Sequence, residues 1–388
     1  MKATELEQIA DPFETYERQA LRATIRAFME KHVVPNLDEW EDAGEIPRWV
    51  HERAGEAGLL GISFPENVGG SGGSVLDLVI LHEETILAGA SSGLSAALFT
   101  NGIALPHIVD SGDEGLIGRY VRPTLAGRMI GALGVTEPDG GSDVANLRTR
   151  ATLHKDEYVV SGSKIYITSG CRADFVTTAV RTGEPGHNGI SLLVIDTDSP
   201  GVHVSRRLRK MGWLCSDTAE LSFDEVRVPR DRIVGAVNGG FKQIMQQFQV
   251  ERVFLATDAY ATAQRAIDLT LDWVRSRETF GSPLSERQAV RHLLAEMSQR
   301  TEAARALTRQ AAVVIARGDD ATLLVSMAKN VATDACLWVV DKAVQLHGGF
   351  GYMRESEVER HYRDAKVLSI GGGSTEIMKD VVAKRLGL

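Results

Sequence analysis

The stretch Tyr158-Val159-Val160-Ser161-Gly162-Ser163-Lys164-Ile165-Tyr166-Ile167 decides the fold class, because it interrupts a long helical pattern with alternating β-branched and aromatic residues. The small residues in its middle, between two apolar runs, predict the turn of a β-hairpin. Further short apolar runs, each bounded by Gly, Pro, Asp or Ser, follow at residues 175–180, 191–195 and 221–228. Runs of this kind indicate a β domain, either a barrel or a sandwich.

Helical periodicity flanks this β segment on both sides. Before it, apolar residues recur at intervals of three and four, as in Leu21, Ile25 and Phe28, and the same period returns after Gly239-Gly240. Long amphipathic helices that follow one another pack as a bundle. We therefore predict an α+β chain with an N-terminal helical domain at residues 1–128, a middle β domain at residues 129–235 and a C-terminal helical bundle at residues 236–388.

Two apolar stripes in the C-terminal third are expected to face the core of this bundle. The first consists of Val290, Leu293, Leu294 and Met297, and the second of Leu324, Met327, Ala328, Val331 and Ala335.

Composition restricts the class of function. The chain of 388 residues has a formal net charge of -9, which disfavours a general nucleic-acid binder. Its three cysteines are scattered and lack metal-ligand spacing, so we expect neither a disulfide framework nor a metal site. Residues 1–20 lack a secretory or transit pattern, and no run of about 18 uncharged apolar residues predicts a membrane span. We expect a cytoplasmic protein.

Two segments of the middle domain combine glycines with short polar side chains. The first, Val135-Thr136-Glu137-Pro138-Asp139-Gly140-Gly141-Ser142-Asp143, can bring backbone N–H groups close to a planar or anionic ligand. The second is Tyr166-Ile167-Thr168-Ser169-Gly170. The first segment alone is more typical of a surface turn, so the pair carries the interpretation rather than either member.

Further motifs accompany this pair in the C-terminal third. They are Glu251-Arg252, Arg277-Glu278-Thr279-Phe280-Gly281, Gln288, Gln345-Leu346-His347-Gly348-Gly349-Phe350-Gly351-Tyr352 and Arg363-Asp364-Ala365-Lys366. In this order and spacing, the set closely resembles the acyl-CoA dehydrogenase family over nearly the whole chain. The resemblance implies the same three domains, ending in a four-helix bundle, and an FAD-dependent oxidoreductase of fatty acid metabolism that converts an acyl-CoA thioester into its trans-2-enoyl product.

The resemblance also implies two sets of cofactor-binding residues. The flavin of one subunit would be lined by Leu133, Val135, Thr136, Ser142, Tyr166 and Thr168, with Thr168 near the reactive ring nitrogen. A neighbouring subunit would reach the FAD adenosine and pyrophosphate with Arg277, Phe280, Gln288, Gln345 and Gly349. Ser374 and Glu376 match positions close to the flavin. A homodimer or homotetramer is therefore expected.

The reaction needs a carboxylate against the α-carbon of the substrate. Many members of the family carry this Glu shortly after Arg-Asp-Ala-Lys, where the present chain has Gly372. Members that resemble the isovaleryl-CoA and long-chain dehydrogenases carry it at the position of Glu251, so we predict Glu251 as the base in preference to Glu376. We expect burial to raise the pKa of Glu251 toward neutrality.

Contacts to the substrate are also implied by the resemblance. The backbone N–H of Gly372 would polarise the thioester carbonyl. Ser142, Arg252, Gly372 and Gly373 would contact the substrate.

Several alternatives stay open. The acyl group could be tethered to an acyl-carrier protein, the fold could support an oxidase or a flavin monooxygenase, or the absence of a Glu at Gly372 could mark a catalytically silent flavoprotein. The resemblance implies an electron-transferring flavoprotein as the electron acceptor. The basic run Arg206-Arg207-Leu208-Arg209-Lys210 could meet a coenzyme A phosphate or an acidic partner, although a solvated strand face is favoured. Acyl length, acyl branching and the choice between dimer and tetramer are not predicted.

Overall fold

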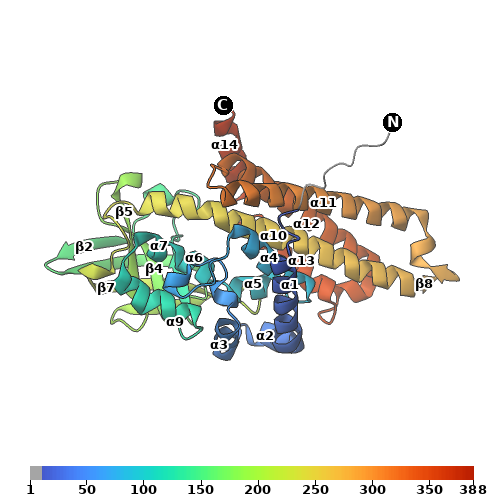
Figure 1. Ribbon diagram of the computed structural model, residues 1–388, viewed down its shortest axis with the longest axis horizontal. Helices are drawn as coiled ribbons and strands as arrows, with labels where there is room; N and C mark the ends of the chain where they lie inside the picture. Colours follow the sequence, from blue (N-terminus) through green and yellow to red (C-terminus); the bar gives the residue numbers. More distant parts are fainter. Residues whose placement is uncertain (1–10) are drawn as a thin grey trace.

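The computed structural model describes residues 11–388 as three packed parts arranged along one long axis. A sheet occupies one end and a helical bundle the other, with the N-terminal helices along one side (Figure 1). The predicted α+β class is confirmed. Residues 1–10, which form part of the segment without a targeting pattern, lie outside the described residues.

The N-terminal part consists of helices grouped around α4, which is buried over most of its length. Ser74 caps α4 reciprocally with Asp77, whose carboxylate accepts the Ser74 N–H at 2.7 Å. Since α4 packs against helices of both its own part and the bundle, its apolar surface is covered on several sides. The helices are α1 (Tyr16–Phe28), α2 (Leu37–Ala43), α3 (Arg48–Glu56), α4 (Val75–Leu87), α5 (Ser92–Leu98), α6 (Asn101–Ala104), α7 (Pro106–Ser111), α8 (Glu114–Leu116) and α9 (Arg122–Leu125).

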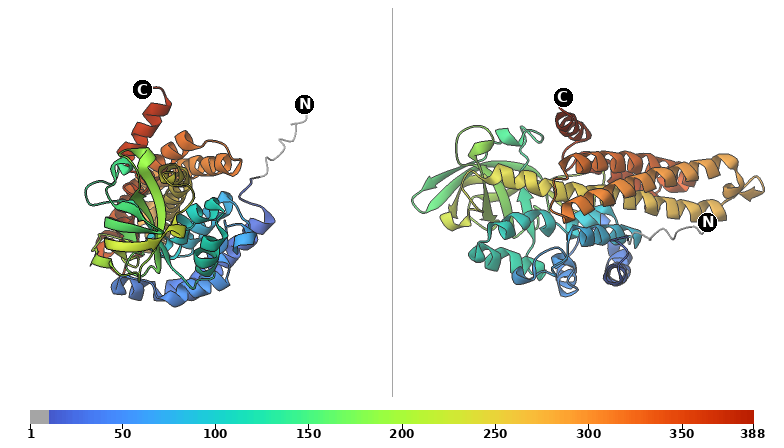
Figure 2. Two further views of the ribbon diagram at one scale, coloured as in Figure 1. Left: turned by 90° about the vertical axis from the view of Figure 1, so that its left-hand side faces the viewer. Right: turned by 45° about the horizontal axis from the view of Figure 1, so that its top comes forward.

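The middle part is one seven-stranded sheet that twists strongly, as the end view in Figure 2 shows. The strand order is β1-β4-β2-β3-β7-β6, with β5 paired to β4. The predicted short runs coincide with strands. Apolar side chains of strands from β1 to β7 fill the interior of the domain. The strands are β1 (Gly131–Gly134), β2 (Arg150–His154), β3 (Glu157–Thr168), β4 (Phe175–Arg181), β5 (Ile190–Asp196), β6 (Val202–Arg207) and β7 (Thr218–Pro229).

The hairpin predicted around Gly162 is wrong. Strand β3 runs unbroken through this position and pairs with β7 on both sides of it. Gly162 has a φ of 151° and coincides with a register shift, so it forms a β-bulge rather than a turn. The actual turn lies between β2 and β3, where Lys155 adopts a φ of 53°.

The C-terminal part is the predicted bundle of long helices. Helix α10 extends from the sheet to the far tip of the bundle and so belongs to both ends of the molecule (Figure 1). A small ribbon of β8 (Glu278–Thr279) and β9 (Ser282–Pro283) joins α10 to α11. The helices are α10 (Gly240–Ser276), α11 (Gln288–Ala316), α12 (Thr322–His347), α13 (Glu357–Leu368) and α14 (Thr375–Arg385).

One segment, Thr322–Tyr352, is long and apolar enough to cross a membrane by length and composition alone. In the structure 56% of its apolar window is buried, because α12 packs against α10, α11 and α13. It also carries the fully buried Lys329. This packing accounts for the apolar composition of α12 as that of a core helix.

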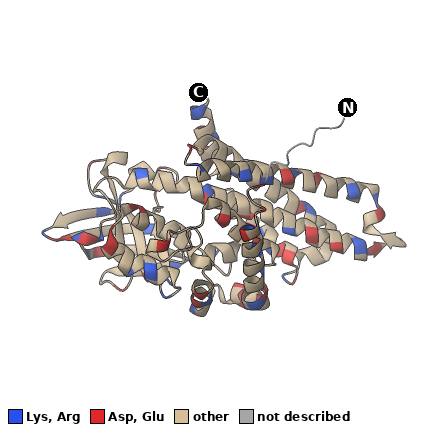
Figure 3. Ribbon diagram, in the orientation of Figure 1, with Lys and Arg blue, Asp and Glu red and all other residues tan. Residues whose placement is uncertain are grey.

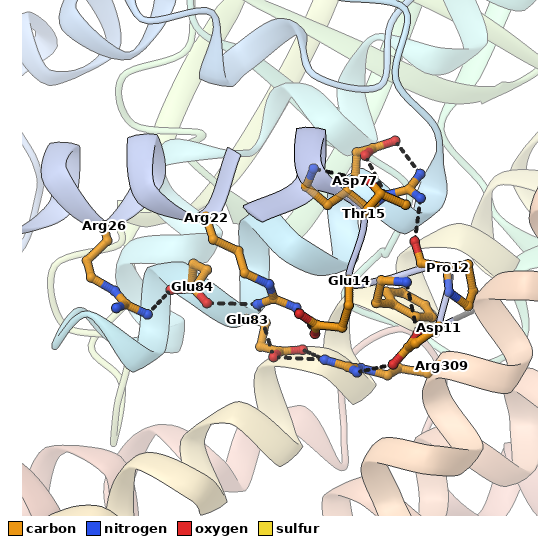
Figure 4. Close-up of polar contacts among 12 residues, drawn as sticks. Asp11, Pro12, Glu14, Thr15, Arg22, Arg26, Asp77, Glu83, Glu84 and Arg309 are labelled. Carbon is orange, nitrogen blue, oxygen red and sulfur yellow. Dashed lines mark hydrogen bonds and ion pairs between the residues drawn. The ribbon is translucent and has the colours of Figure 1, made fainter. Parts of the chain in front are cut away.

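A buried ionic cluster joins the N-terminal part to the bundle (Figure 4). The carboxylate of Glu83 on α4 accepts hydrogen bonds from Arg22 on α1 at 3.2 Å and from Arg309 on α11 at 3.1 Å. The hydroxyl of Tyr260 on α10 donates a third at 2.6 Å. Because removal of one partner would leave a buried charge poorly compensated, this cluster fixes the relative placement of four helices.

The basic run at residues 206–210 lies on and just after β6, which is largely exposed. Arg206 pairs with Glu220 at 2.9 Å and Arg207 pairs with Glu45 at 3.0 Å. Figure 3 shows both signs of charge interspersed over all three parts. The geometry agrees with the favoured interpretation of a solvated strand face.

Candidate active site

Glu251 on α10 is half-buried, and its Oε2 atom is shut off from solvent. No protein group between residues 11 and 388 donates a hydrogen bond to this oxygen. Most buried polar atoms are hydrogen-bonded, so this oxygen is a candidate for contact with a ligand or a reacting group. Burial raises the pKa of the Glu251 carboxyl, and the positive charges of Arg252 and Lys329 offset only part of that increase.

Gly372 lies directly beside this carboxylate, in the turn between α13 and α14. Its φ of 62° belongs to the left-handed region, which favours glycine. A Cβ atom added to Gly372 would lie 3.6 Å from Oε1 of Glu251 and only 2.5 Å from Cδ1 of Leu255. The structure therefore brings together the two positions that were weighed as the source of the base, although they are far apart in the sequence.

Two cations hold the Gly372-Gly373 turn by its carbonyl groups. Nε of Arg252 donates to the Gly372 carbonyl at 3.0 Å, and Nζ of Lys329 donates to the Gly373 carbonyl. Arg252 follows Glu251 directly on α10, but its side chain is buried against the turn and does not face solvent. Among the described residues, no protein acceptor takes the Gly372 N–H.

Lys329 is a site residue that the sequence did not reveal. It is fully buried on α12, and burial together with the nearby Arg252 lowers the pKa of its ammonium to about 8, with Glu251 acting in the opposite direction. The only available signal was a lone Lys within a strongly apolar helix, between Ala328 and Asn330. Such a Lys is rarely buried unless it is paired.

The loop that holds the first glycine-containing segment packs against β3 directly before the second segment. The N–H of Ile165 donates to the carbonyl of Thr136 at 2.9 Å, which joins the loop after β1 to β3. The buried Lys164 donates to the carbonyl of Val135 at 3.0 Å and to Glu137 at 2.8 Å. Burial lowers the pKa of Lys164 to about 8, with the Glu137 carboxylate opposing the decrease. This buried pair keeps the loop against the strand.

The residues of this segment pair fit a bound flavin. Tyr166 and Ser169 adopt φ values of 61° and 60°, a conformation that costs free energy for residues other than glycine and is concentrated at ligand sites. Tyr166 is also 67% exposed, so a large aromatic face is free to cover a planar ring. Leu133, Thr136 and Thr168 are half-buried, Val135 is buried, and Ser142 lies exposed on the loop.

Helix α6 connects the segment pair to the helix that carries Glu251. The hydroxyl groups of Thr100 and Ser169 lie 2.7 Å apart in a buried hydrogen bond. On the other side, Nε2 of Gln247 on α10 donates to the carbonyl of Gly102 at 3.0 Å. The β domain and Glu251 are thus held together through the N-terminal part.

The second predicted set of cofactor residues lies elsewhere. Arg277 ends α10, 26 residues after Glu251, which is about 39 Å at the usual helical rise. This separation exceeds the diameter of a small domain, so one protomer does not bring both sets to one site. Arg277, Phe280, Gln288, Gln345 and Gly349 are all exposed at the bundle tip.

The remaining two predicted residues lie at the start of α14. Ser374 is the N-cap, and its hydroxyl accepts the N–H of Ile377 at 3.4 Å. Glu376 is exposed in the first turn, where hydrogen bonding to its own N–H and to Ser374 lowers the pKa of its carboxyl. It therefore lacks the burial that distinguishes Glu251.

The fold and the site together define a flavin-dependent acyl dehydrogenase, with a shielded carboxylate oxygen and a strained loop pair suited to a flavin. Family models agree for all three parts of the chain. The N-terminal domain of acyl-CoA dehydrogenases matches residues 15–128, the middle domain residues 132–226 and the C-terminal domain residues 238–387. The chain belongs to the acyl-CoA dehydrogenase family.

Individual relatives support this assignment over almost the full length. A solved structure described as "a probable acyl CoA dehydrogenase" from Mycobacterium abscessus is 62% identical, with a TM-score of 0.96 over 97% of this chain and 100% of that one. The mitochondrial long-chain specific acyl-CoA dehydrogenase of Rattus norvegicus is 36% identical over 95% of this chain and 86% of its own length. A subunit of the caffeyl-CoA reductase-Etf complex of Acetobacterium woodii is 34% identical over 95% of this chain and 98% of its own length. The chain is an oxidoreductase, and its cofactor is FAD.

Proposed function

We propose that this enzyme converts an acyl-CoA thioester into the trans-2-enoyl-CoA, with Glu251 as the base that takes the α-proton. Bound FAD supplies the acceptor for the β-hydride. The observation that carries the proposal is the buried Oε2 of Glu251, because a base needs a lone pair that no protein donor already occupies. Its raised pKa strengthens it as a proton acceptor.

The Gly372-Gly373 turn has the second role in the proposal. The free N–H of Gly372 donates to the thioester carbonyl, which stabilises the negative charge that develops when the α-proton leaves. Arg252 and Lys329 hold the carbonyl groups of this turn and so fix the direction of its N–H. Glycine at position 372 also leaves room for the carboxylate of Glu251.

The test is an anaerobic titration of the FAD-loaded enzyme with straight and branched acyl-CoAs, followed by flavin bleaching. The Glu251→Gln variant should retain FAD and lose about 10²–10⁴-fold in the rate of bleaching, the usual contribution of a general base. Glu376→Gln is the matched control and should bleach at nearly the wild-type rate. Equal losses in both variants would contradict the assignment of Glu251.

The same titration separates the alternatives. Absence of bleaching by any acyl-CoA, followed by bleaching with acyl-carrier-protein thioesters, would identify a carrier-tethered substrate. Rapid peroxide release in air would indicate an oxidase.

Three properties of the assembly complete the proposal. An electron-transferring flavoprotein reoxidises the enzyme, a proposal supported by the relative that is named as part of an Etf complex. A homodimer or homotetramer brings the exposed tip residues to the FAD of a neighbouring protomer. The cytoplasm is the proposed compartment, in keeping with three cysteines that are all free thiols.

A further inference from the structure

Lys329 has an environment that packing alone does not explain. Its side chain is completely buried on α12, and its Nζ atom donates to the carbonyl of Gly373. The next residue, Asn330, donates to the carbonyl of Thr375 at 3.1 Å. One turn of α12 therefore holds the segment from Gly373 to the start of α14.

The charge of Lys329 has no direct counter-ion in the described residues. A neutral carbonyl does not compensate a buried ammonium, and the transfer of such a charge out of water is strongly unfavourable. The acidic group that interacts with it is Glu251, although no ion pair within 4.0 Å joins the two. A Met at this position would fill similar space without that cost, so the charge itself needs an explanation.

The groups that act on Glu251 come from few elements. Arg252 on α10 and Lys329 on α12 supply positive charge, while the turn at residues 371–373 supplies only glycines. Glu376 on α14 is exposed to solvent. Without the two cations, burial would raise the pKa of Glu251 further and so shift its equilibrium toward the protonated form, which cannot accept a proton.

We propose that Lys329 is a positioning residue for proton abstraction, which holds the Gly372-Gly373 turn and keeps Glu251 ionised in its buried site. This inference rests on the proposed role of Glu251 as the base. Lys329 contacts neither Glu251 nor any atom that reacts. It acts by holding the turn and through the electrostatic field of its ammonium group. Its effect therefore appears in the proton affinity of Glu251 and not in a step of its own.

The test uses Lys329→Met and Lys329→Gln in the FAD-loaded enzyme. Met removes both charge and donor, whereas Gln keeps a donor for the Gly373 carbonyl and removes only the charge. Ser326→Ala is the matched control, since Ser326 is equally buried on α12 and its hydroxyl donates only to the carbonyl of Thr322. Measurements of FAD content and of thermal unfolding identify any variant that has lost its cofactor or its fold.

The first readout is the infrared signal of the protonated Glu251 carboxyl against pH, assigned by its loss in Glu251→Gln. It needs no substrate, so it tests Lys329 even if acyl-CoA oxidation fails. We expect its midpoint to rise by about one pH unit in both Lys329 variants, the lower end of the effect of a nearby opposite charge. An unshifted midpoint in Lys329→Met, or a wild-type midpoint in Lys329→Gln, would overturn the charge account.

The second readout is the rate of flavin reduction by acyl-CoA against pH. On the acid side of the profile, Lys329→Met should be about tenfold slower than wild type, because one pH unit corresponds to a tenfold change in the ionised fraction. The rate should approach that of wild type at high pH. A loss that is the same at every pH would indicate a purely structural role and contradict the proposal.

Discussion

The two ends of α10 present two kinds of site on one helix. Around Glu251, a single protomer supplies the carboxylate, the Gly372 turn and two cations; the cations are buried, and Glu251 and Gly372 are half-buried. At the other end, Arg277 and Phe280 are exposed, and Phe280 makes almost no contact with its own protomer. The first arrangement is governed by burial and charge within one protomer, whereas the second is an exposed surface that, under the function proposed above, becomes a site beside a second copy.

This difference predicts which substitutions act within one protomer and which act between copies. Changes near Glu251 should alter chemistry, pH dependence or the unfolding of the protomer. Changes at the tip should alter FAD retention and association while the protomer keeps its stability.

Among the effects on cofactor binding, stability and association, the largest is expected at the tip. Arg277→Ala should weaken FAD binding about 10- to 100-fold, because a hydrogen bond to a charged group contributes about 1.5–3 kcal/mol. FAD fluorescence released on dilution measures this. The matched control is Arg275→Ala, which removes an exposed Arg two residues earlier that lies 3.7 Å from Asp272. Equal FAD loss in both variants would indicate a general charge effect and not a specific contact.

At the base end, Gly372→Ala should lower the free energy of unfolding by about 1–2 kcal/mol. The left-handed region is less favourable by about that free energy for a residue with a Cβ, and the new atom would also displace the side chain of Leu255. Urea unfolding checks the value. Gly371→Ala is the control, because its added Cβ would meet only ordinary contacts and its φ is not positive. Similar losses in both variants would show that the backbone at Gly372 is not special.

The buried Glu251 also makes stability depend on pH. Its pKa is raised in the folded state, so the folded protein holds this proton to higher pH than the unfolded chain, and stability falls as pH rises through that window. Glu251→Gln cannot lose a proton, so it should gain stability relative to wild type as the pH rises from the ordinary pKa of a Glu carboxyl through the raised pKa of Glu251. Thermal unfolding of the FAD-loaded pair measures the difference. A difference that does not change with pH would mean that the carboxyl titrates normally.

The smallest effect is expected for Phe280→Ala. Since the side chain is fully exposed, the unfolding free energy of the protomer should change by no more than about 0.5 kcal/mol. Sedimentation should nevertheless show weaker self-association than in the wild type. Destabilisation of the isolated protomer would contradict the division between the two ends.

Much of the fold could be predicted because its signals are local. The helical period, the short β runs and the glycine breaks are each set by residues that lie only a few positions apart in the sequence. The hairpin was wrong because Gly162 suits both a turn and a bulge, and only pairing with β7 separates the two. The stripe predicted on α12 was partly wrong, since Val331 is 40% exposed while Val325 and Lys329 are buried. A helix that is apolar on all sides does not reveal which face its neighbours cover.

The candidate site could be predicted only in part. Resemblance supplied Glu251 and Gly372, and the structure adds their proximity. The roles of the individual site residues stay predictions. Lys329 could not be predicted, because its contact with Gly373 joins residues from different helices and depends on how α12 meets the turn before α14. Burial and the absence of a donor at Glu251 likewise arise only from tertiary packing.

The most direct test of the central claim isolates the proton step from the hydride step. Acetyl-CoA and phenylacetyl-CoA have α-hydrogens but no β-hydrogens, so the FAD-loaded enzyme in D₂O can exchange their α-protons without reducing the flavin. If Glu251 is the base, mass spectrometry or NMR should show deuterium incorporation with wild type and with Glu376→Gln, and almost none with Glu251→Gln. Undiminished exchange in Glu251→Gln would contradict the account and place the base elsewhere.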